Sequence, residues 1–509
     1  MTRYQIRLYH ISKVLQSKSA VVFQVVDDQP KRIDVMANKT KIVATIGPAS
    51  SGKSVLKKMI SSGMNVARIN FSHGSNEEHA RAINVIRSLS RSMSRPIGII
   101  LDLQGPKIRT GRLEGSEPLL LKRNGNIRIT TKNILGTADT ISTTYLKLAD
   151  DIQKGDRILL DDGLIELRAL SKTDNTVSCK IIHGGILREH KGINLPGVDI
   201  SAPSLTAKDR KDISFGIKSG VDFFALSFVR NEDDVKLIKS IIKKQGSDIP
   251  VIAKIEKPEA VKNLNKILQV SDGIMVARGD LGVEMKPEKV PTIQKHIIHK
   301  AIKANRPVIT ATQMLETMIN NPIPTRAEAS DVANAIYDGT DAVMLSGETA
   351  LGRYPEKAVR MMTRIAAEAE KSIFMKYDRQ YDKDTAYTIT HAVAQSSARI
   401  LNDVKAKAIV VFSVSGNTSK LIARQRPSKP VYAFTPNTKI YNRMALSWGI
   451  IPQYVPRILK TERLIEASEK LLLQKGLIKN DDLIVLITGL ALKSGSTNLI
   501  KIHKVGQDD

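Results

Sequence analysis

The chain has 509 residues, of which 42% are hydrophobic and 25% charged, the composition of a globular protein long enough for about three domains. No apolar run approaches the roughly 20 residues that span a bilayer, so we expect no membrane-spanning segment. The formal net charge is +27, but the lysines are spread along the chain and aromatic residues make up only 4%. This distribution argues against nucleic-acid binding and favours a solvated basic surface.

Residues 1–35 differ from the rest of the chain. They contain basic residues and serines, with no acidic residue before Asp27, which resembles an organelle transit peptide. The alternatives are an upstream start, with Met36 as the working beginning, and a disordered tail. The only cysteine, Cys179, excludes an internal disulfide and is typical of a reducing compartment. We therefore expect a cytoplasmic protein, with organellar targeting as the alternative.

From Lys39 onward, short apolar strands alternate with helical segments, for instance 54–61, 77–93, 233–244 and 327–337. Each strand is a nearly continuous apolar run, as expected when both faces of a parallel strand are covered. Eight strand-helix units are the number that closes a TIM barrel. The expected strands are residues 41–45, 65–70, 97–103, 223–228, 251–256, 273–277, 308–312 and 342–345.

Polar residues follow the ends of seven of these eight strands. In a TIM barrel, the C-terminal ends of the strands form the active-site face. Helix capping or turn formation explains any one of these residues, but does not readily explain the whole set. The set is Asn70, Ser72, Asp102, Ser227, Arg230, Lys254, Glu256, Asp280, Thr312, Gln313, Ser346 and Glu348.

The most informative stretch is residues 251–288. Its first strand alternates, so Lys254 and Glu256 share one face, and burying an ammonium there is costly unless an anion meets it. A helix over 258–269 leads to a second strand that ends near Asp280. Parallel strands joined in this way bring Glu256 and Asp280 to the same end of a sheet, where paired carboxylates suit Mg²⁺. The alternative is an ordinary Lys–Glu ion pair in an α/β core.

Residues 111–203 lack a helical period and contain short alternating strands instead. The turn pairs Asn124-Gly125 and Asp162-Gly163 separate these strands. We expect a small β-barrel domain inserted in a loop of the TIM barrel, where it can act as a lid. Its expected strands are residues 119–121, 127–130, 157–160, 164–167 and 178–182.

Residues 372–509 have strands between helices, which indicates a C-terminal open α/β sheet domain. Residues 413–419 link a strand to a helix start, where backbone amides and hydroxyls hold phosphate well. Capping by Asn417 or Thr418 explains the same pattern. The expected strands are residues 408–412, 431–434, 451–454 and 483–488. The expected domains are an N-terminal extension (1–37), the barrel (38–110 and 204–371), the inserted domain (111–203) and the C-terminal domain (372–509).

Ten sequence blocks, in order, resemble the signatures of pyruvate kinases, among them LDLQGPKIRTG (101–111), AKIEKPEA (253–260) and MVARGDLGVE (275–284). The resemblance covers residues 38–509. It implies a glycolytic enzyme that moves the phosphoryl group of phosphoenolpyruvate to ADP, giving pyruvate and ATP. It also implies a homotetramer, with a site for a phosphorylated effector formed by residues 413–419 and 489–498.

The resemblance implies a role for each matching residue. Glu256 and Asp280 would hold Mg²⁺ or Mn²⁺, and Lys254 would neutralise charge on the transferred phosphoryl group and on the enolate. Arg68 and Arg109 would clamp phosphate oxygens.

The same resemblance places substrate and nucleotide contacts. The backbone amides of Gly279 and Asp280, with the Thr312 hydroxyl, would seat the substrate carboxylate. Thr312 and Ser346 would lie near the water that protonates the enolate. The residues expected around the nucleotide are Thr45, Pro48, His73, Arg68, Lys191 and Asp162.

One position sets this chain apart from relatives that need K⁺. Those relatives hold K⁺ with residues matching Asn70, Ser72, Asp102 and the carbonyl of Leu103, and they carry a glutamate where this chain has Lys107. A fixed ammonium can supply the positive charge that is otherwise taken from solution. We therefore expect activity without K⁺.

Two alternatives concern the activity. Metal-dependent lyases or aldolases that act on pyruvate enolates use the same barrel, but they lack the inserted β domain. A non-catalytic relative is expected to have lost Lys254, Glu256 or Asp280, and all three are present.

Overall fold

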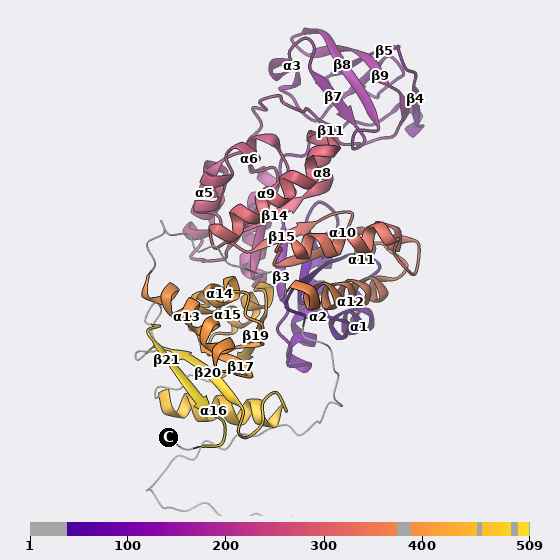
Figure 1. The fold of residues 1–509 in the computed structure, drawn as a ribbon. Helices are drawn as coiled ribbons and strands as arrows, with labels where there is room; N and C mark the ends of the chain where they lie inside the picture. Colours follow the sequence, from indigo (N-terminus) through magenta and orange to yellow (C-terminus); the bar gives the residue numbers. More distant parts are fainter. Residues whose placement is uncertain (1–37, 374–387, 456–460, 490–496, 508–509) are drawn as a thin grey trace, which may run out of the picture. The chain divides into compact units, whose positions relative to one another are not determined.

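The computed structural model describes residues 38–373, 388–455, 461–489 and 497–507 (Figure 1). The chain divides into two units, Met1–Val35 and Met36–Asp509, and all described residues belong to the second. The predictions for residues 1–35 and for most of 489–498 therefore lie outside the described residues. Among the described helices, none is long and apolar enough to cross a membrane. The domain boundaries stay predictions.

Eight parallel strands close into a barrel in the order β1-β16-β15-β14-β13-β12-β3-β2. All eight predicted strands are present, with ends at most two residues from the expected ones, which confirms the TIM barrel. The strands are β1 (Lys41–Ile46), β2 (Val66–Asn70), β3 (Gly98–Asp102), β12 (Phe223–Leu226), β13 (Val251–Ile255), β14 (Gly273–Ala277), β15 (Val308–Ala311) and β16 (Ala342–Leu345).

Helices follow the strands and pack on the outside of the barrel. Three of them begin with a capping box, in which Ser75, Thr206 and Thr325 each exchange hydrogen bonds with an acid three residues later. The longer helices are α1 (Lys53–Ser61), α2 (Asn76–Ser92), α4 (Ala207–Ser219), α5 (Glu232–Lys244), α9 (Val290–Lys303), α10 (Arg326–Tyr337) and α12 (Pro355–Ile373).

The single helix predicted over 258–269 was wrong. The structure has two helices there, α6 (Pro258–Lys262) and α7 (Leu264–Val270), which meet at Asn263. Asn263 leaves helical geometry at φ −90° and ψ 10°, and its side-chain amide donates to the carbonyl of Arg230. A side chain that hydrogen-bonds backbone outside the helix competes with helix continuation at its own position.

The inside of the barrel has two layers. Because strand side chains alternate, the residue two positions after an inward-facing one also faces inward. Lys254 follows the inward-facing Ile252 in this way, and Arg68 follows Val66, so a polar layer lies at the C-terminal ends of the strands. The layer beneath it is apolar and includes Val43, Val66, Ile100, Phe223, Ile252, Met275, Ile309 and Met344.

The segment between β3 and β12 contains the inserted β module, residues 111–203. A small β-barrel was predicted for this module. The structure has two sheets there, one of six strands in the order β11-β7-β8-β9-β5-β6 and one formed by β10 and β4 (Figure 1). Asn124 and Asp162 adopt positive φ angles of 67° and 55°, as the predicted turns require. The strands are β4 (Leu119–Leu121), β5 (Asn126–Thr130), β6 (Thr140–Ser142), β7 (Arg157–Leu160), β8 (Ile165–Thr173), β9 (Thr176–His183), β10 (Gly185–Leu187) and β11 (Ile193–Asn194).

The single cysteine should be unreactive in the folded protein. Cys179 on β9 is buried in the apolar core of the module, and burial raises the pKa of its thiol to about 12. Because the thiolate is the reactive form and a raised pKa keeps the thiol protonated at pH 8, we expect alkylation by iodoacetamide to be roughly 100-fold or more slower than in the unfolded chain. Intact mass after timed labelling, with and without guanidinium, measures this; equal rates would contradict it.

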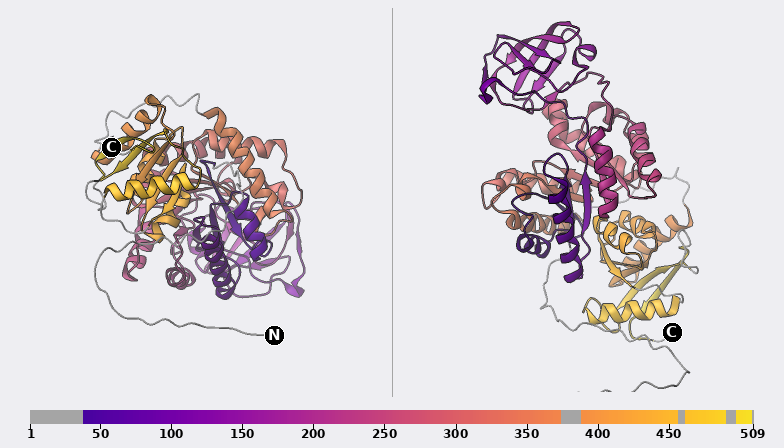
Figure 2. Two further views of the ribbon diagram at one scale, coloured as in Figure 1. Left: turned by 90° about the horizontal axis from the view of Figure 1, so that it is seen from below. Right: turned by 180° about the vertical axis from the view of Figure 1, so that it is seen from behind.

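The C-terminal sheet has the order β19-β18-β17-β20-β21. Its four predicted strands are present, and β21 is an additional strand that pairs antiparallel with β20. Helix α16 (Thr461–Gln474) packs Leu464 and Leu472 on one face, and α13 (Ile389–Asp403) packs Ala394 and Leu401 on the other. Figure 2 shows α16, in yellow, along the strands. The strands are β17 (Ala408–Phe412), β18 (Val431–Thr435), β19 (Ile450–Tyr454), β20 (Leu483–Thr488) and β21 (Leu499–Lys504).

Candidate active site

Lys254 lies inside the barrel near the C-terminal end of β13. Its ammonium is 2.8 Å from Glu256 Oε1 and 3.4 Å from Asp102 Oδ1, and it donates to Ser227 Oγ at 2.7 Å. Burial lowers the pKa of Lys254, but Asp102 and Glu256 more than offset this effect, so the pKa lies above its ordinary value. The structure therefore holds a permanent positive charge in the barrel mouth.

Glu256 is almost completely buried beside this lysine. Its side chain is 1% exposed, and Oε2 accepts a hydrogen bond from the backbone N–H of Phe228 at 2.6 Å. Burial raises the pKa of Glu256 and Lys254 lowers it, with a net shift upward. Phe228 itself has a positive φ of 54°, which is uncommon for a bulky residue and marks a position that the surrounding structure constrains.

Asp102 connects Lys254 to a second cation. Arg68 Nε donates to Asp102 Oδ2 at 2.7 Å, and Arg68 Nη1 donates to Thr45 Oγ1 at 3.0 Å. Burial raises the pKa of Asp102, but Lys254 and Arg68 together hold it below its usual value. Charges of alternating sign thus run across the polar layer from Glu256 through Lys254 and Asp102 to Arg68.

Asp280 joins the group from the next strand. Helix α8 (Arg278–Glu284) begins directly after β14, which places Asp280 in its first turn. The Asp280 carboxylate raises the pKa of Lys254 and of Glu256, so the three groups lie within electrostatic range of one another. The prediction that Glu256 and Asp280 meet at one end of the barrel agrees with this arrangement.

Two hydroxyls lie at the ends of β15 and β16. Thr312 has a positive φ of 70°, and its Oγ1 accepts from the backbone N–H of Gly279 at 2.7 Å. The backbone N–H of Ser346 donates to Glu348 Oε2 at 2.7 Å. The Ser346 hydroxyl is buried and has no hydrogen-bond partner within the described part of the chain. A buried hydroxyl of this kind is a natural position for a water or a ligand atom.

The positions that match monovalent-cation ligands lie around the same polar layer. Asn70 Oδ1 accepts from the backbone N–H of Ser72 at 3.2 Å. The carbonyl of Leu103 accepts from Ser227 Oγ at 2.7 Å, and Asp102 pairs with two buried cations. Three of these four residues therefore already use oxygens in hydrogen bonds or ion pairs within the protein.

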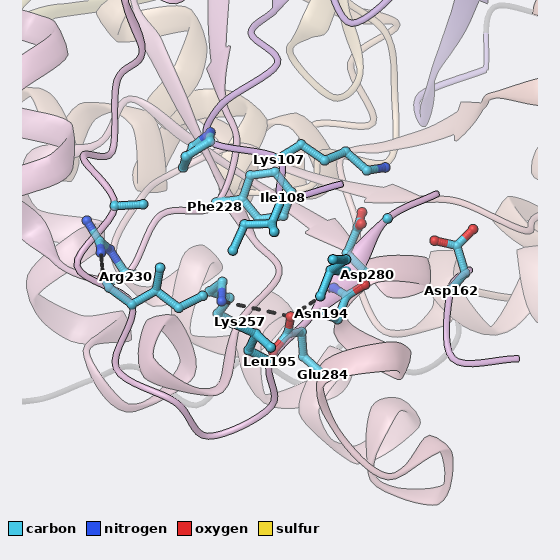
Figure 3. Close-up of a pocket in the computed structure, with 15 residues that line it drawn as sticks. Lys107, Ile108, Asp162, Asn194, Leu195, Phe228, Arg230, Lys257, Asp280 and Glu284 are labelled. Atoms are coloured by element: carbon cyan, nitrogen blue, oxygen red, sulfur yellow. Dashed lines mark hydrogen bonds and ion pairs between the residues drawn. The ribbon is translucent and has the colours of Figure 1, made fainter. Parts of the chain in front are cut away.

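A pocket opens where the inserted β module meets the barrel (Figure 3). Three predicted site residues line it, namely Lys107, Asp162 and Asp280. Sequence reasoning did not predict roles for Asn194, Lys257 and Glu284, which also line it. The other lining side chains are largely apolar and include Ile108, Ile193, Leu195, Ile200 and Phe228.

Lys191 and Arg109 lie on the two segments that connect the module to the barrel. The Lys191 ammonium pairs with Asp161 Oδ1 at 2.8 Å, and Arg109 Nη1 donates to the carbonyl of His190 at 3.0 Å. The backbones of the two segments pair through an antiparallel bridge between Arg109 and Gly192. Lys191 is thus held beside the turn that carries Asp162.

His73 and Pro48 follow β2 and β1 and are both exposed. Partial burial lowers the pKa of His73, and the nearby cations Arg109, Lys107 and Arg68 lower it further. His73 therefore stands at the edge of a positively charged region that extends into the barrel mouth, while neither His73 nor Pro48 is among the residues that line the pocket.

The residues present fit a magnesium ion. Mg²⁺ usually binds through one or two carboxylates and completes its shell with waters and substrate oxygens. Glu256 and Asp280 supply two carboxylates at neighbouring strand ends. Over the described ranges, no group of three or more His, Cys, Asp or Glu side chains is arranged to hold a metal.

A closed parallel barrel with buried charges gathered at the C-terminal ends of its strands is the arrangement of a (β/α)8 enzyme. Figure 3 shows how the inserted module adds side chains to this site.

Comparisons with known proteins identify the family. Residues 37–359 match the family model "Pyruvate kinase, barrel domain", and residues 391–503 match "Pyruvate kinase, alpha/beta domain". The chain belongs to the pyruvate kinase family and is a phosphotransferase. This assignment confirms the resemblance found in the sequence.

Individual relatives agree with this assignment. The chain is 46% identical over 475 residues to the pyruvate kinase of Geobacillus stearothermophilus, covering 92% of this chain and 81% of that one. It is 45% identical over 474 residues to the pyruvate kinase of Staphylococcus aureus (strain MRSA252), with the same coverage. The crystal structure of a pyruvate kinase from Cryptosporidium parvum has a TM-score of 0.87 at 39% identity, covering 93% of this chain and 97% of that chain.

Proposed function

We propose that this enzyme transfers the phosphoryl group of phosphoenolpyruvate to ADP, giving pyruvate and ATP through an enolate that is then protonated. The observation that carries this proposal is the buried Lys254 ammonium, held among Glu256, Asp102 and Ser227. Mg²⁺ or Mn²⁺ held by Glu256 and Asp280 would, when bound, polarise substrate oxygens and offset phosphoryl charge. The alternative activity considered from the sequence, that of a pyruvate-enolate lyase, would not require residues that bind a nucleotide, such as Lys191 and Asp162.

Lys254 supplies positive charge where the reaction develops negative charge. As the P–O bond breaks, negative charge develops on the leaving enolate oxygen beside the phosphoryl oxygens, and exclusion of water strengthens the attraction of both to a fixed ammonium. Arg68, oriented by Asp102 and Thr45, holds phosphate oxygens, and Arg109 approaches them from the segment that leads into the inserted module.

The two hydroxyls at the ends of β15 and β16 serve the proton transfer. Thr312, with the backbone amides of Gly279 and Asp280, seats the substrate carboxylate. Thr312 and Ser346 hold the water that protonates the enolate carbon, a role supported by the unpartnered Ser346 hydroxyl.

The nucleotide binds on the side of the inserted module. Lys191 and Arg68 contact its phosphates, and Asp162 faces its metal ion. Thr45, Pro48 and His73 border the rest of the nucleotide. The positive region around His73 supports this placement, because it suits a polyphosphate.

A coupled assay for pyruvate, with ATP measured in parallel, tests the proposed reaction. We expect pyruvate and ATP in equal amounts, only when phosphoenolpyruvate, ADP and a divalent ion are all present. Removal of the divalent ion with EDTA should lower the rate by about 100-fold or more while leaving the melting temperature nearly unchanged, because the ion completes the substrate site rather than the fold. Pyruvate release without ATP would contradict the proposal.

We expect activity that is independent of K⁺. The oxygens of Asn70, Asp102 and Leu103 have protein partners, and Lys107 brings a fixed positive charge to the adjacent pocket. Rates in K⁺ buffer and in a buffer with only large organic cations should therefore agree within about twofold. Activation by K⁺ of tenfold or more would contradict this prediction. Lys107→Glu should then create a dependence on K⁺ where the parent has none.

The proposal extends to regulation, assembly and location. We expect a homotetramer in the cytoplasm, with a phosphorylated effector near residues 413–419. Helix α14 (Asn417–Arg424) begins after Gly416, which has a φ of 78°, and Ser419 Oγ is buried with no partner in the described part of the chain. Light scattering with and without sugar phosphates measures assembly and its response to effectors.

A further inference from the structure

Glu284 lies where three segments of the chain meet. It is the last residue of α8, and its side chain is 4% exposed. Its Oε1 accepts a hydrogen bond from Asn194 Nδ2 at 2.9 Å, and the ammonium of Lys257 lies 3.8 Å from the same oxygen. Figure 3 shows Lys257 and Asn194 reaching this carboxylate from different segments. A buried carboxylate with two such partners constrains all three segments.

Each of the three segments carries a residue of the proposed site. Helix α8 carries Asp280, which is one turn before Glu284 and therefore on the same face of the helix. Lys257 directly follows Glu256 in the chain. Asn194 belongs to β11, the short strand by which the inserted module returns to the barrel.

Strand β11 is coupled to the part of the module that carries Lys191 and Asp162, the residues proposed to contact the nucleotide. Asn194 is three residues after Lys191, and its neighbour Ile193 pairs with Leu160, just before the turn that contains Asp162. The backbone N–H of Asp161 donates to the carbonyl of Gly192 at 3.1 Å. A displacement of β11 therefore moves Lys191 and the Asp162 turn together.

Lys257 also balances charge within α8. Two carboxylates at positions i and i+4 repel each other, and Asp280 and Glu284 both line one pocket. Without a nearby cation, burying the charged form of Glu284 beside Asp280 would be unfavourable. Lys257 lies in the loop after β13, and its ammonium offsets the repulsion between these two carboxylates.

We propose that Asn194, Glu284 and Lys257 form a latch that fixes the nucleotide side of the inserted β module against α8. They are positioning residues, which act through Lys191 and through the turn that carries Asp162, both on the module. This inference rests on the proposed function. It predicts that loss of the latch weakens the response to ADP far more than the response to phosphoenolpyruvate, whose contacts lie within the barrel.

Steady-state kinetics of single variants test the latch. Asn194→Ala should raise KM for ADP about tenfold, because a hydrogen bond to a buried charged group is lost. KM for phosphoenolpyruvate and kcat should stay within about threefold of the wild type. Lys257→Met should also raise KM for ADP. Lys257→Arg, which keeps the positive charge, should raise it less than Lys257→Met does. The matched control is Glu166→Gln, which makes a carboxylate-to-amide change at the Arg157 ion pair of the same module and should change neither KM.

A double-mutant cycle separates a latch from independent contacts. If Asn194 acts through Glu284, Asn194→Ala combined with Glu284→Gln should be no worse than the worse single variant, whereas independent effects would multiply. Equal rises in both KM values, unchanged kinetics, or multiplied effects would overturn the latch. If Asn194→Ala fails to fold, the Lys257→Met and Lys257→Arg pair decides the same question. An inactive wild type would instead overturn the proposed function, so the two failures are distinguishable.

Discussion

Lys254→Met should lower kcat by about three orders of magnitude or more, while KM for phosphoenolpyruvate changes less than about tenfold. The large effect on kcat and the small effect on KM are expected because of where the ammonium lies. It is buried among Glu256, Asp102 and Ser227, so its field is hardly screened by water, and the negative charge on the enolate oxygen develops only as the reaction proceeds. Substrate binding uses the other cations and the metal site, which the substitution leaves in place.

A coupled assay over a range of substrate concentrations measures both constants. The matched control is Lys236→Met, which removes a lysine from the exposed ion pair with Asp233 and should leave both constants unchanged. A melting curve for each variant shows whether the fold is intact. If Lys254→Met kept its turnover but lost affinity, Lys254 would be a binding residue rather than the cation that stabilises the transition state.

The sequence predicted those parts of the site that depend on local periodicity. Lys254 and Glu256 are two positions apart on a strand, and Asp280 follows the next one, so strand alternation and parallel connection were sufficient to bring them together. The eight strands of the barrel were predictable for the same reason. Apolar runs bounded by polar residues recur with a regular spacing, and each strand end lies within two residues of its expected position.

Features that depend on distant segments were not predictable in this way. The Ser227 hydroxyl that Lys254 contacts belongs to a residue type common at any strand end. Asn194 and Glu284 are 90 positions apart, and only the placement of the module against α8 brings them together. Strands β6, β10 and β11 have only two or three residues each and were not predicted, although the equally short β4 was. Sequence periodicity thus predicted the barrel and its polar layer. The contacts between the inserted module and the barrel could be found only in the folded structure.

The largest effect on stability is expected at Asp341, just before β16. Its side chain is 1% exposed and pairs with Arg424 Nη1 at 2.8 Å and with Arg426 Nη2 at 3.0 Å. Asp341 Oδ2 also accepts from the backbone N–H of Val308 at 2.8 Å. Asp341→Ala removes the carboxylate with which two largely buried guanidinium groups pair. Breaking a buried pair in this way costs about 3–5 kcal/mol, so we expect a clearly lowered melting temperature.

Two further variants separate charge from hydrogen bonding at this position. Asp341→Asn keeps an oxygen that can accept from Val308 but removes the charge. It should therefore be nearly as destabilising as Asp341→Ala if the lost charge pairing with Arg424 and Arg426 is the cause. Asp403→Ala, at the exposed pair with Arg399, removes an aspartate without stranding a buried cation and should melt with the wild type. If Asp341→Asn also melted with the wild type, the hydrogen bond accepted from Val308 within the barrel, and not the ion pairs with Arg424 and Arg426, would account for the stability lost in Asp341→Ala.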